Sequence, residues 1–249
     1  MPMKITEDSC FYPDSIIYFD PVHIGLQRED IWVEERLHCW FIQPRKETFK
    51  SVTIINLHGN AENMTSHIMG ALFFLEMGHR LVTFDYSGYG QSKGRPTLSG
   101  IQDDARAVFR FVFDLPVRFG ETIFGFGQSM GGFTLARILP DFPELTGAIL
   151  DSALYSFYDL FREAYPFAEC NVPQVSALDT LPLSTVPKLF IHGTADEVVP
   201  YTHSLKMFAS AHEPKDILII EGVGHISALT SPFADQYVAR VKTFLADLS

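Results

Sequence analysis

The sequence predicts an α/β fold with a mostly parallel, doubly wound sheet, formed as a single domain over residues 1–249. Three observations predict it. Short apolar runs alternate with helix-length segments through most of the chain. The run at residues 51–57 is almost entirely apolar, as expected for a parallel strand that is covered on both faces. The 249-residue length, with 47% apolar and 20% charged residues, suits one globular domain with a substantial core.

Eight strands are expected. Residues 28–34 and 37–42 carry apolar side chains at near-alternate positions, which predicts an antiparallel pair joined by a turn at Glu35-Arg36. The other strands are predicted over residues 51–57, 81–84, 122–126, 148–150, 188–191 and 216–220. Alternation of these strands with helices implies parallel connections and helices on both faces of the sheet.

Helices are expected over residues 64–77, 99–113, 130–139, 201–211 and 233–245. The second begins after a possible N-cap at Ser99 and has apolar residues at helical spacing. The third stops before Pro140, which cannot donate to the helical ladder. No internal repeat, low-complexity tract or linker divides the chain.

Residues 152–186 break this alternation, because they are rich in aromatic residues and proline where one crossover helix would suffice. An irregular connection with one helix is one interpretation. A short lid that lines a pocket is the other, and it is favoured because long connections in compact domains are often functional.

Composition excludes several classes of protein. Nineteen Lys and Arg against thirty Asp and Glu give a net charge of −11, which disfavours binding to nucleic acids and anionic lipids. Cys10, Cys39 and Cys170 form neither a disulfide framework nor a zinc motif. No signal peptide or membrane-spanning segment is recognised, so no stable membrane insertion and a cytoplasmic location are expected. The sequence leaves open whether the protein is a monomer or a dimer.

The most specific motif is G-x-S-x-G over residues 127–131, with Ser129 at its centre. It follows a predicted strand and opens a predicted helix, which is the setting of a nucleophile elbow. The serine of such a turn occupies strained backbone space, and Gly127 and Gly131 carry no Cβ that could clash. Ser129 is therefore the candidate nucleophile.

A serine nucleophile needs a base and an acid that orients the base. His225 lies in a glycine-rich loop after the last strand, and Asp196 follows the strand before it. Active sites of open α/β sheets form at the carboxyl ends of the strands, where all three residues are expected. Asp151, at the end of an earlier strand, is the alternative acid.

The oxyanion needs preplaced donors. The backbone N–H of Met130 is one candidate, and that of Asn60, in the loop after residues 51–57, is the other, with Ala61 as a less favoured neighbour. His58 is interpreted as support for this loop, and Asp85 as tied to backbone amides. His192 and Asp196 stand four residues apart but at a strand end, so no metal site and no cofactor are expected.

These residues carry a family resemblance. The segments LHGNAEN (57–63), DYSGYGQS (85–92) and GQSMGG (127–132) resemble the serine α/β-hydrolase superfamily, and within it the BEM46-like branch, which is similar to serine aminopeptidase-type hydrolases and to eukaryotic acyl-protein depalmitoylases. The resemblance implies the α/β-hydrolase fold, the triad Ser129, Asp196 and His225, and an oxyanion hole at Asn60 and Met130. Two features depart from the family: Ser87 replaces a usual arginine, and the cysteine-rich N-terminus of the depalmitoylases is absent.

The resulting hypothesis is a cofactor-independent serine hydrolase that cleaves a small-molecule or acyl ester or thioester through an acyl-enzyme. A serine peptidase or amidase of the same fold is the enzymatic alternative. A ligand-binding protein that retains a hydrolase scaffold is the alternative from another class.

Overall fold

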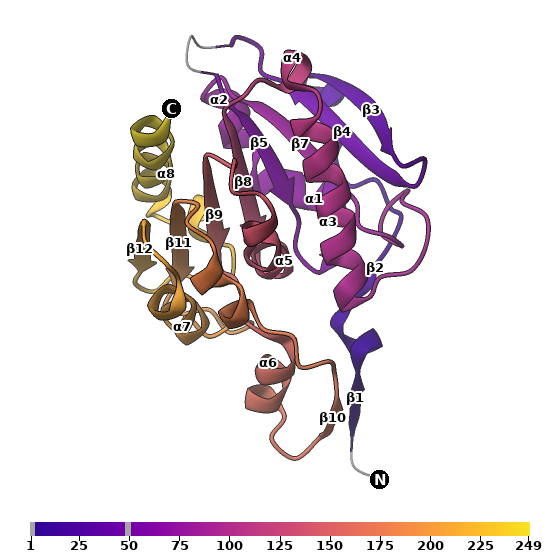
Figure 1. Ribbon diagram of the computed structural model, residues 1–249, viewed down its shortest axis with the longest axis vertical. Helices are drawn as coiled ribbons and strands as arrows, with labels where there is room; N and C mark the ends of the chain where they lie inside the picture. Colours follow the sequence, from indigo (N-terminus) through magenta and orange to yellow (C-terminus); the bar gives the residue numbers. More distant parts are fainter. Residues whose placement is uncertain (1–2, 48–50) are drawn as a thin grey trace.

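The computed structural model describes residues 3–47 and 51–249, and its centre is an eight-stranded sheet. The strands lie in the order β12-β11-β9-β8-β5-β7-β4-β3 (Figure 1). Each predicted strand corresponds to one of them, and their bounds are β3 (Gln27–Val33), β4 (Leu37–Gln43), β5 (Thr53–Leu57), β7 (Arg80–Phe84), β8 (Ile123–Gln128), β9 (Gly147–Asp151), β11 (Lys188–Gly193) and β12 (Lys215–Ile220). The predicted fold class is confirmed.

The antiparallel part of the sheet is confined to its first strands. β3 pairs antiparallel with β4, and β4 pairs antiparallel with β7, whereas the strands from β7 to β12 run parallel. The turn between β3 and β4 centres on Glu34 and Glu35, which both have positive φ (51° and 54°). Two left-handed residues are typical of a type I′ hairpin. The hairpin is confirmed, with its turn one residue earlier than predicted.

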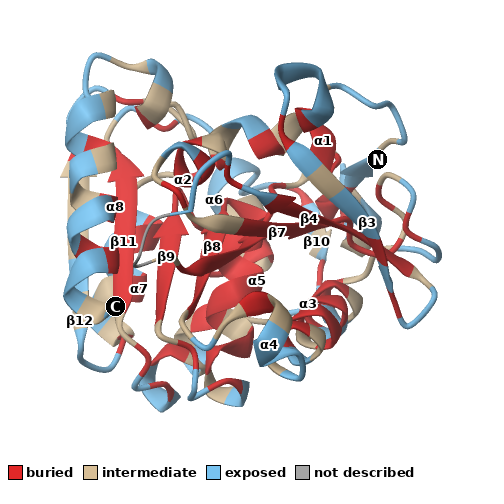
Figure 2. Cartoon of the chain, turned by 90° about the horizontal axis from the view of Figure 1, so that it is seen from above, coloured by how far each residue is buried: buried red, intermediate tan, exposed pale blue. Residues whose placement is uncertain are grey.

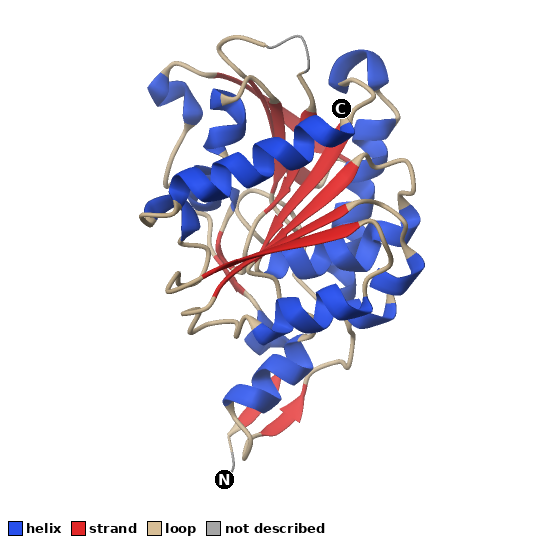
Figure 3. Ribbon diagram, turned by 90° about the vertical axis from the view of Figure 1, so that its left-hand side faces the viewer, coloured by secondary structure: helices blue, strands red, loops and turns tan. Residues whose placement is uncertain are grey.

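Helices cover both faces of the sheet (Figure 3). One face packs against α1 (Met64–His67), α2 (Leu72–Glu76) and α8 (Ala234–Leu248). The other packs against α3 (Leu98–Phe113), α4 (Pro116–Phe119), α5 (Met130–Ile138) and α7 (Thr202–Ser210). Neighbouring strand residues therefore belong to different cores: Ile54 lies in the first and Ile55 in the second. Figure 2 shows that the central strands are buried, that α8 is exposed along one side and that α5 is largely buried.

Two helix predictions differ from the structure. The segment predicted as one helix over residues 64–77 is α1, a 3-10 turn (Ile68–Gly70) and α2. Gly70 packs against Gln128, and a Cβ at Gly70 would lie 2.6 Å from the Gln128 Oε1 atom. The second difference is the start of α3, whose N-cap is Thr97 and not Ser99. The Thr97 Oγ1 atom accepts a hydrogen bond of 2.9 Å from the Gly100 amide, as an N-cap side chain does.

Residues 152–186 contain one α-helix, α6 (Phe157–Ala164), then β10 (Glu169–Asn171) and two 3-10 turns (Ala177–Asp179 and Leu181–Leu183). β10 pairs in parallel with β1 (Lys4–Thr6) near the N-terminus, and Figure 1 shows β1, β10 and α6 projecting beyond the carboxyl ends of the main strands. A 3-10 turn (Glu7–Cys10) follows β1. Phe157 anchors α6 in the core through aromatic contacts with Phe11 and Phe133.

A second pair of short strands joins the N-terminal segment to the loop after β5. β2 (Tyr12–Pro13) pairs in parallel with β6 (Ala61–Glu62), and a 3-10 turn (Pro21–Ile24) follows before β3. Strands of two or three residues leave no periodic pattern, so the sequence did not reveal these pairings. Their effect is to hold the N-terminal segment against the loop that contains Asn60.

Candidate active site

Ser129 occupies the turn between β8 and α5 in a backbone conformation that is rare for a residue with a side chain. Its φ is 53° and its ψ is −115°. Its amide donates a 2.9 Å hydrogen bond to the carbonyl of Asp151, at the end of the neighbouring strand β9. Such strain persists only where surrounding structure imposes it, and it is concentrated at functional sites.

The glycines of the motif are required by close backbone packing. A Cβ at Gly131 would overlap the carbonyl oxygen of Leu57, and one at Gly127 would lie 2.5 Å from the carbonyl oxygen of Gly131. A Cβ at Gly132 would lie 2.5 Å from the Ala153 side chain. The first turn of α5 is therefore pressed against the end of β5, and this packing holds Ser129 in its strained turn.

Asp196 and His225 lie side by side on the loops after β11 and β12. The His225 Nδ1 atom is 2.7 Å from the Asp196 Oδ2 atom. These strands are parallel neighbours, so both loops leave the same edge of the sheet. A Cβ at Gly193 would overlap the Val223 carbonyl, and that carbonyl accepts a 3.0 Å hydrogen bond from the Ala195 amide. Glycine at position 193 thus permits the approach that brings the acid to the histidine.

Four donors surround the Asp196 carboxylate. Its Oδ1 atom accepts hydrogen bonds from the amides of Val198 (2.9 Å) and Val199 (2.8 Å), and its Oδ2 atom lies 3.0 Å from His192 Nε2 as well as near His225. Burial by itself raises the pKa of Asp196, but hydrogen bonds from His192, His225 and the backbone outweigh it and lower the pKa. The carboxylate is therefore ionised although its side chain is fully buried.

His192 is a site residue that sequence reasoning missed as a partner of the acid. Its Nε2 atom also lies 2.8 Å from the Val199 carbonyl, so this nitrogen carries the proton, and its Nδ1 atom accepts from the Ser204 hydroxyl at 2.7 Å. The imidazole thus donates to Asp196 and fixes its orientation. Its position four residues before Asp196 is the signal that the sequence offers for this contact.

The loops around Ser129 and His225 are also connected. The Ile226 amide donates to the Ser152 hydroxyl at 3.3 Å, and Ser152 follows the residue that holds the Ser129 amide. Ser129, Asp196 and His225 therefore lie at one edge of the sheet. Within the described residues, no hydrogen bond joins the Ser129 hydroxyl to His225.

Asp151, the alternative acid, is occupied elsewhere. Its carboxyl group accepts hydrogen bonds from Gln128 (2.9 Å), Tyr237 (3.0 Å) and Ser152 (3.1 Å). Burial raises its pKa, although these hydrogen bonds act against the rise. The structure thus pairs His225 with Asp196, and not with Asp151.

The two candidate oxyanion donors belong to adjacent elements. Met130 is the first residue of α5, where backbone amides have no acceptor within the helix. Asn60 lies in the loop after β5, the strand next to β8, and its side-chain oxygen accepts from the Tyr12 amide (3.2 Å) and the Tyr89 hydroxyl (3.0 Å). These bonds anchor the side chain of Asn60.

His58 and Asp85 form a second histidine–carboxylate pair, buried beneath this loop. The His58 Nδ1 atom lies 2.7 Å from the Gly59 carbonyl, whereas its Nε2 atom has no hydrogen-bond partner in the described part of the chain and is 3.6 Å from Asp85 Oδ1. Burial lowers the pKa of His58 to about 3 and raises that of Asp85 to about 7. Asp85 accepts from the Met64 amide at 2.7 Å, as expected from the sequence.

Ser87, where the sequence resemblance leads us to expect an arginine, is contacted by an arginine from another segment. The Ser87 amide and hydroxyl both donate to Asp104, at 2.7 and 3.0 Å, and the Arg36 guanidinium contacts Ser87 and Asp104. A guanidinium from the β3–β4 hairpin therefore reaches this loop.

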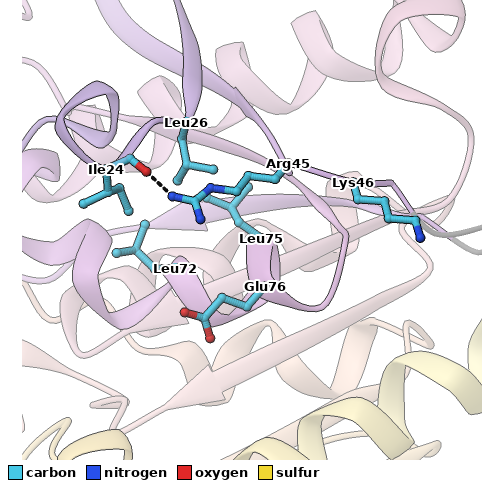
Figure 4. A pocket seen from close by; sticks show the side chains of 7 residues that line it. All are labelled: Ile24, Leu26, Arg45, Lys46, Leu72, Leu75 and Glu76. Carbon is cyan, nitrogen blue, oxygen red and sulfur yellow. Dashed lines mark hydrogen bonds between the residues drawn. The ribbon is translucent and has the colours of Figure 1, made fainter.

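A depression of about 440 Å³ borders the site on the side of α1. Its lining comes from β6, from α1 and the turn that follows, from the end of β8 and from the segment after His225; the residues are Glu62, Ser66, His67, Met69, Gly70, Gln128, Ile226, Leu229 and Thr230. A separate hollow lies between the end of β4 and α2, where Arg45 donates to the carbonyl of Ile24 (Figure 4). The labelled residues of that hollow include no candidate nucleophile or histidine.

Two further properties concern residues 3–47 and 51–249. None of their helices combines the length and the apolar character needed to cross a bilayer. Their His, Cys, Asp and Glu side chains form no group of three or more suited to a metal ion.

The fold agrees with comparisons to known proteins. The model of the alpha/beta hydrolase fold family matches residues 52–181, and the chain belongs to this family. Among its relatives is the protein YfhR of Escherichia coli (strain K12), described as uncharacterized, which is 30% identical over 243 residues, with 94% of this chain and 85% of the relative covered. Human alpha/beta hydrolase domain-containing protein 17B is 31% identical over 224 residues, covering 85% and 71%.

Solved structures of lower identity share the fold. The esterase Pf2001 of Pyrococcus furiosus superposes with a TM-score of 0.79 at 19% identity, covering 96% of this chain and 97% of that chain. Est1E of Butyrivibrio proteoclasticus, solved with ferulic acid bound, gives a TM-score of 0.72 at 20% identity, covering 88% and 98%.

Proposed function

We propose that this protein is a serine hydrolase that cleaves carboxylic esters or thioesters through an acyl-enzyme intermediate. The observation that carries the proposal is the joint placement of a strained, glycine-flanked Ser129 and a hydrogen-bonded Asp196–His225 pair at one edge of the sheet. Membership of the alpha/beta hydrolase family and the fold shared with two esterases support it.

The mechanism follows from the tautomer of His225. Its Nδ1–H donates to Asp196, so Nε2 carries the lone pair that can accept the Ser129 proton. The Ser129 Oγ atom then attacks the substrate carbonyl, and the amides of Met130 and Asn60 stabilise the oxyanion. His225 returns the proton to the leaving group as its bond to the carbonyl carbon breaks.

The second half of the reaction regenerates the enzyme. His225 removes a proton from a water molecule, which attacks the acyl-enzyme carbonyl, and Ser129 leaves with the proton from His225. Asp196 stabilises the imidazolium in both halves. Its depressed pKa means that it remains an anion while His225 is protonated.

Labelling with a fluorophosphonate probe tests the proposal. Wild type should react covalently, and Ser129→Ala should not, while its turnover falls by roughly 10⁴-fold or more. Ser210→Ala, whose hydroxyl bonds the Met207 carbonyl on α7, is the matched control and should label like wild type. Absence of labelling in folded wild type would instead favour a ligand-binding protein on a hydrolase scaffold.

A further inference from the structure

The depression beside His225 contains an imidazole that the proposed mechanism does not use. His67 lies on its wall, and its ring packs against the loop with the proposed oxyanion donor: a Cβ at Gly59 would lie 2.8 Å from the His67 Cε1 atom. The same ring stacks on His58, with ring centroids 5.6 Å apart. These contacts fix the ring next to the reacting centre.

The proton on His67 can be assigned from its hydrogen bond. The Nε2 atom lies 2.9 Å from the Ala61 carbonyl, and a carbonyl only accepts, so Nε2 carries hydrogen. Burial is the largest cause that lowers the pKa of His67, and the nearby His225 lowers it further. The hydrogen bond to the Ala61 carbonyl and the charge of Glu62 raise this pKa, but they do not outweigh burial. The ring is therefore neutral, and Nδ1, which has no partner among the described residues, is an acceptor.

The position of the depression decides which part of a substrate it could hold. Ile226, the residue after His225, lines one side, and the segment after the proposed oxyanion loop lines another. The leaving group must lie next to the base that protonates it. A group that departs toward His225 therefore enters this depression.

The charge of the lining restricts the leaving group further. Glu62 is a carboxylate, and the residues that line the depression include no lysine or arginine. An anionic leaving group, such as one that carries phosphates, would be repelled at this short range. A neutral group with O–H or N–H donors would be matched by the acceptor of His67.

On these grounds we propose that the depression is the leaving-group subsite, and that His67 selects esters or thioesters whose neutral leaving group donates a hydrogen bond to its Nδ1 atom. Glu62 selects against phosphate-bearing leaving groups. This inference rests on the proposed hydrolase function and adds the substrate class to it.

The first test varies the leaving group at constant acyl chain. Wild type, His67→Phe and His67→Gln are compared on ethyl and glyceryl esters of one fatty acid. Phenylalanine keeps the ring packing and removes both nitrogens, whereas glutamine keeps a donor and an acceptor. His67→Phe should lower the ratio of kcat/KM for the glyceryl ester to kcat/KM for the ethyl ester about three- to tenfold, with recovery of the ratio in His67→Gln. His212→Gln, on an exposed histidine away from the site, is the control.

The second test varies charge. N-acetylcysteamine and coenzyme A thioesters share an amide-bearing thiol arm, but only the latter carries phosphates. Glu62→Gln should raise kcat/KM for the coenzyme A thioester roughly threefold to tenfold relative to the other thioester. Glu76→Gln removes an equal charge beside the distant hollow and should leave the ratio unchanged.

Two outcomes would overturn the inference: equal losses on ethyl and glyceryl esters in His67→Phe, or an unchanged thioester ratio in Glu62→Gln. Fluorophosphonate labelling of Ser129 in every variant separates these outcomes from failure of the hydrolase proposal, which would abolish labelling in wild type itself.

Discussion

Asp196 with His225 and Asp85 with His58 are both carboxylate–imidazole pairs at the carboxyl edge of the sheet, each on loops that directly follow strands. In the first pair the two side chains share a 2.7 Å hydrogen bond, and in the second the nearest nitrogen and oxygen are 3.6 Å apart. Their surroundings also differ. Asp196 has two backbone amides and a second histidine as donors, and His225 is 18% exposed.

The buried pair is held differently: Asp85 also accepts from backbone amides, that of Met64 at 2.7 Å among them, but it lies 3.6 Å from His58 Nε2, and its burial outweighs these donors and raises its pKa. The ring of His58 is enclosed by Tyr86, Tyr89 and His67, and burial favours the neutral forms of both His58 and Asp85. The comparison shows that residue type alone does not make a base. A carboxylate must be held ionised by donors, and the imidazole must reach solvent or substrate, before the pair can move a proton.

Replacing the two histidines gives the largest expected contrast. His225→Gln removes the proposed base, so kcat should fall by about 10⁴-fold or more. His58→Gln should retain activity within about tenfold, because His58 supports the loop and touches no reacting atom. Steady-state hydrolysis of a p-nitrophenyl ester, with circular dichroism to check folding, measures both. If folded His58→Gln lost more kcat than His225→Gln, His58 and not His225 would be the base.

The two acids provide the next contrast. Asp196→Asn should lower kcat by about 10³- to 10⁴-fold, because an amide cannot stabilise the His225 cation and favours the wrong tautomer. Asp85→Asn and Asp151→Asn are the matched controls, and each should stay within about tenfold of wild type. If Asp151→Asn gave the large loss and Asp196→Asn the small one, the acid would be at the end of β9.

The smallest expected effect concerns stability and pH. Folded Asp85 keeps its proton up to about pH 7, whereas the unfolded chain loses it near the ordinary value of 3.8, so this group makes stability fall as pH rises between them. Folded His58 stays unprotonated down to about pH 3, whereas the unfolded chain binds a proton below 6.5, so this group makes stability rise with pH. Between about pH 4 and 6.5, the effects of Asp85 and His58 on the free energy of unfolding therefore change with pH in opposite directions.

Replacing one residue at a time should reveal how each group makes the free energy of unfolding depend on pH. Relative to wild type, His58→Gln should lose stability as pH rises from 4.5 to 6.5, and Asp85→Asn should gain it, each by up to about 1.4 kcal/mol per pH unit. Urea unfolding at several pH values measures these slopes. If the free energies of unfolding of the two variants changed with pH in the same way, the buried pair would not be held neutral.

Much of the architecture could be predicted from the sequence because its signals are local. A continuous apolar run such as residues 51–57 indicates a strand covered on both faces, and all eight main strands were predicted from patterns of this kind. The turn at Ser129 was also predictable, since Gly127 and Gly131 mark positions where backbone must approach backbone.

Features that depend on contacts between distant segments were not predictable. The pairing of β1 with β10 spans more than 160 residues and involves three residues on each strand. Gly70, at the break in the helix predicted over residues 64–77, packs against Gln128, which lies more than 50 residues further along the chain. Neither contact leaves a periodic trace in the sequence.

The sequence by itself determined the fold class, the glycine-flanked serine and the candidate residues at strand ends, because periodicity and steric requirements act over a few neighbouring residues. Only the tertiary structure decided which carboxylate meets His225, why the pKa of Asp196 is lowered while that of Asp85 is raised, and that His67 lines a depression beside the site. The physical reason is that ionisation and hydrogen bonding depend on solvent exposure and on donors supplied by other segments, and these are set when the chain packs.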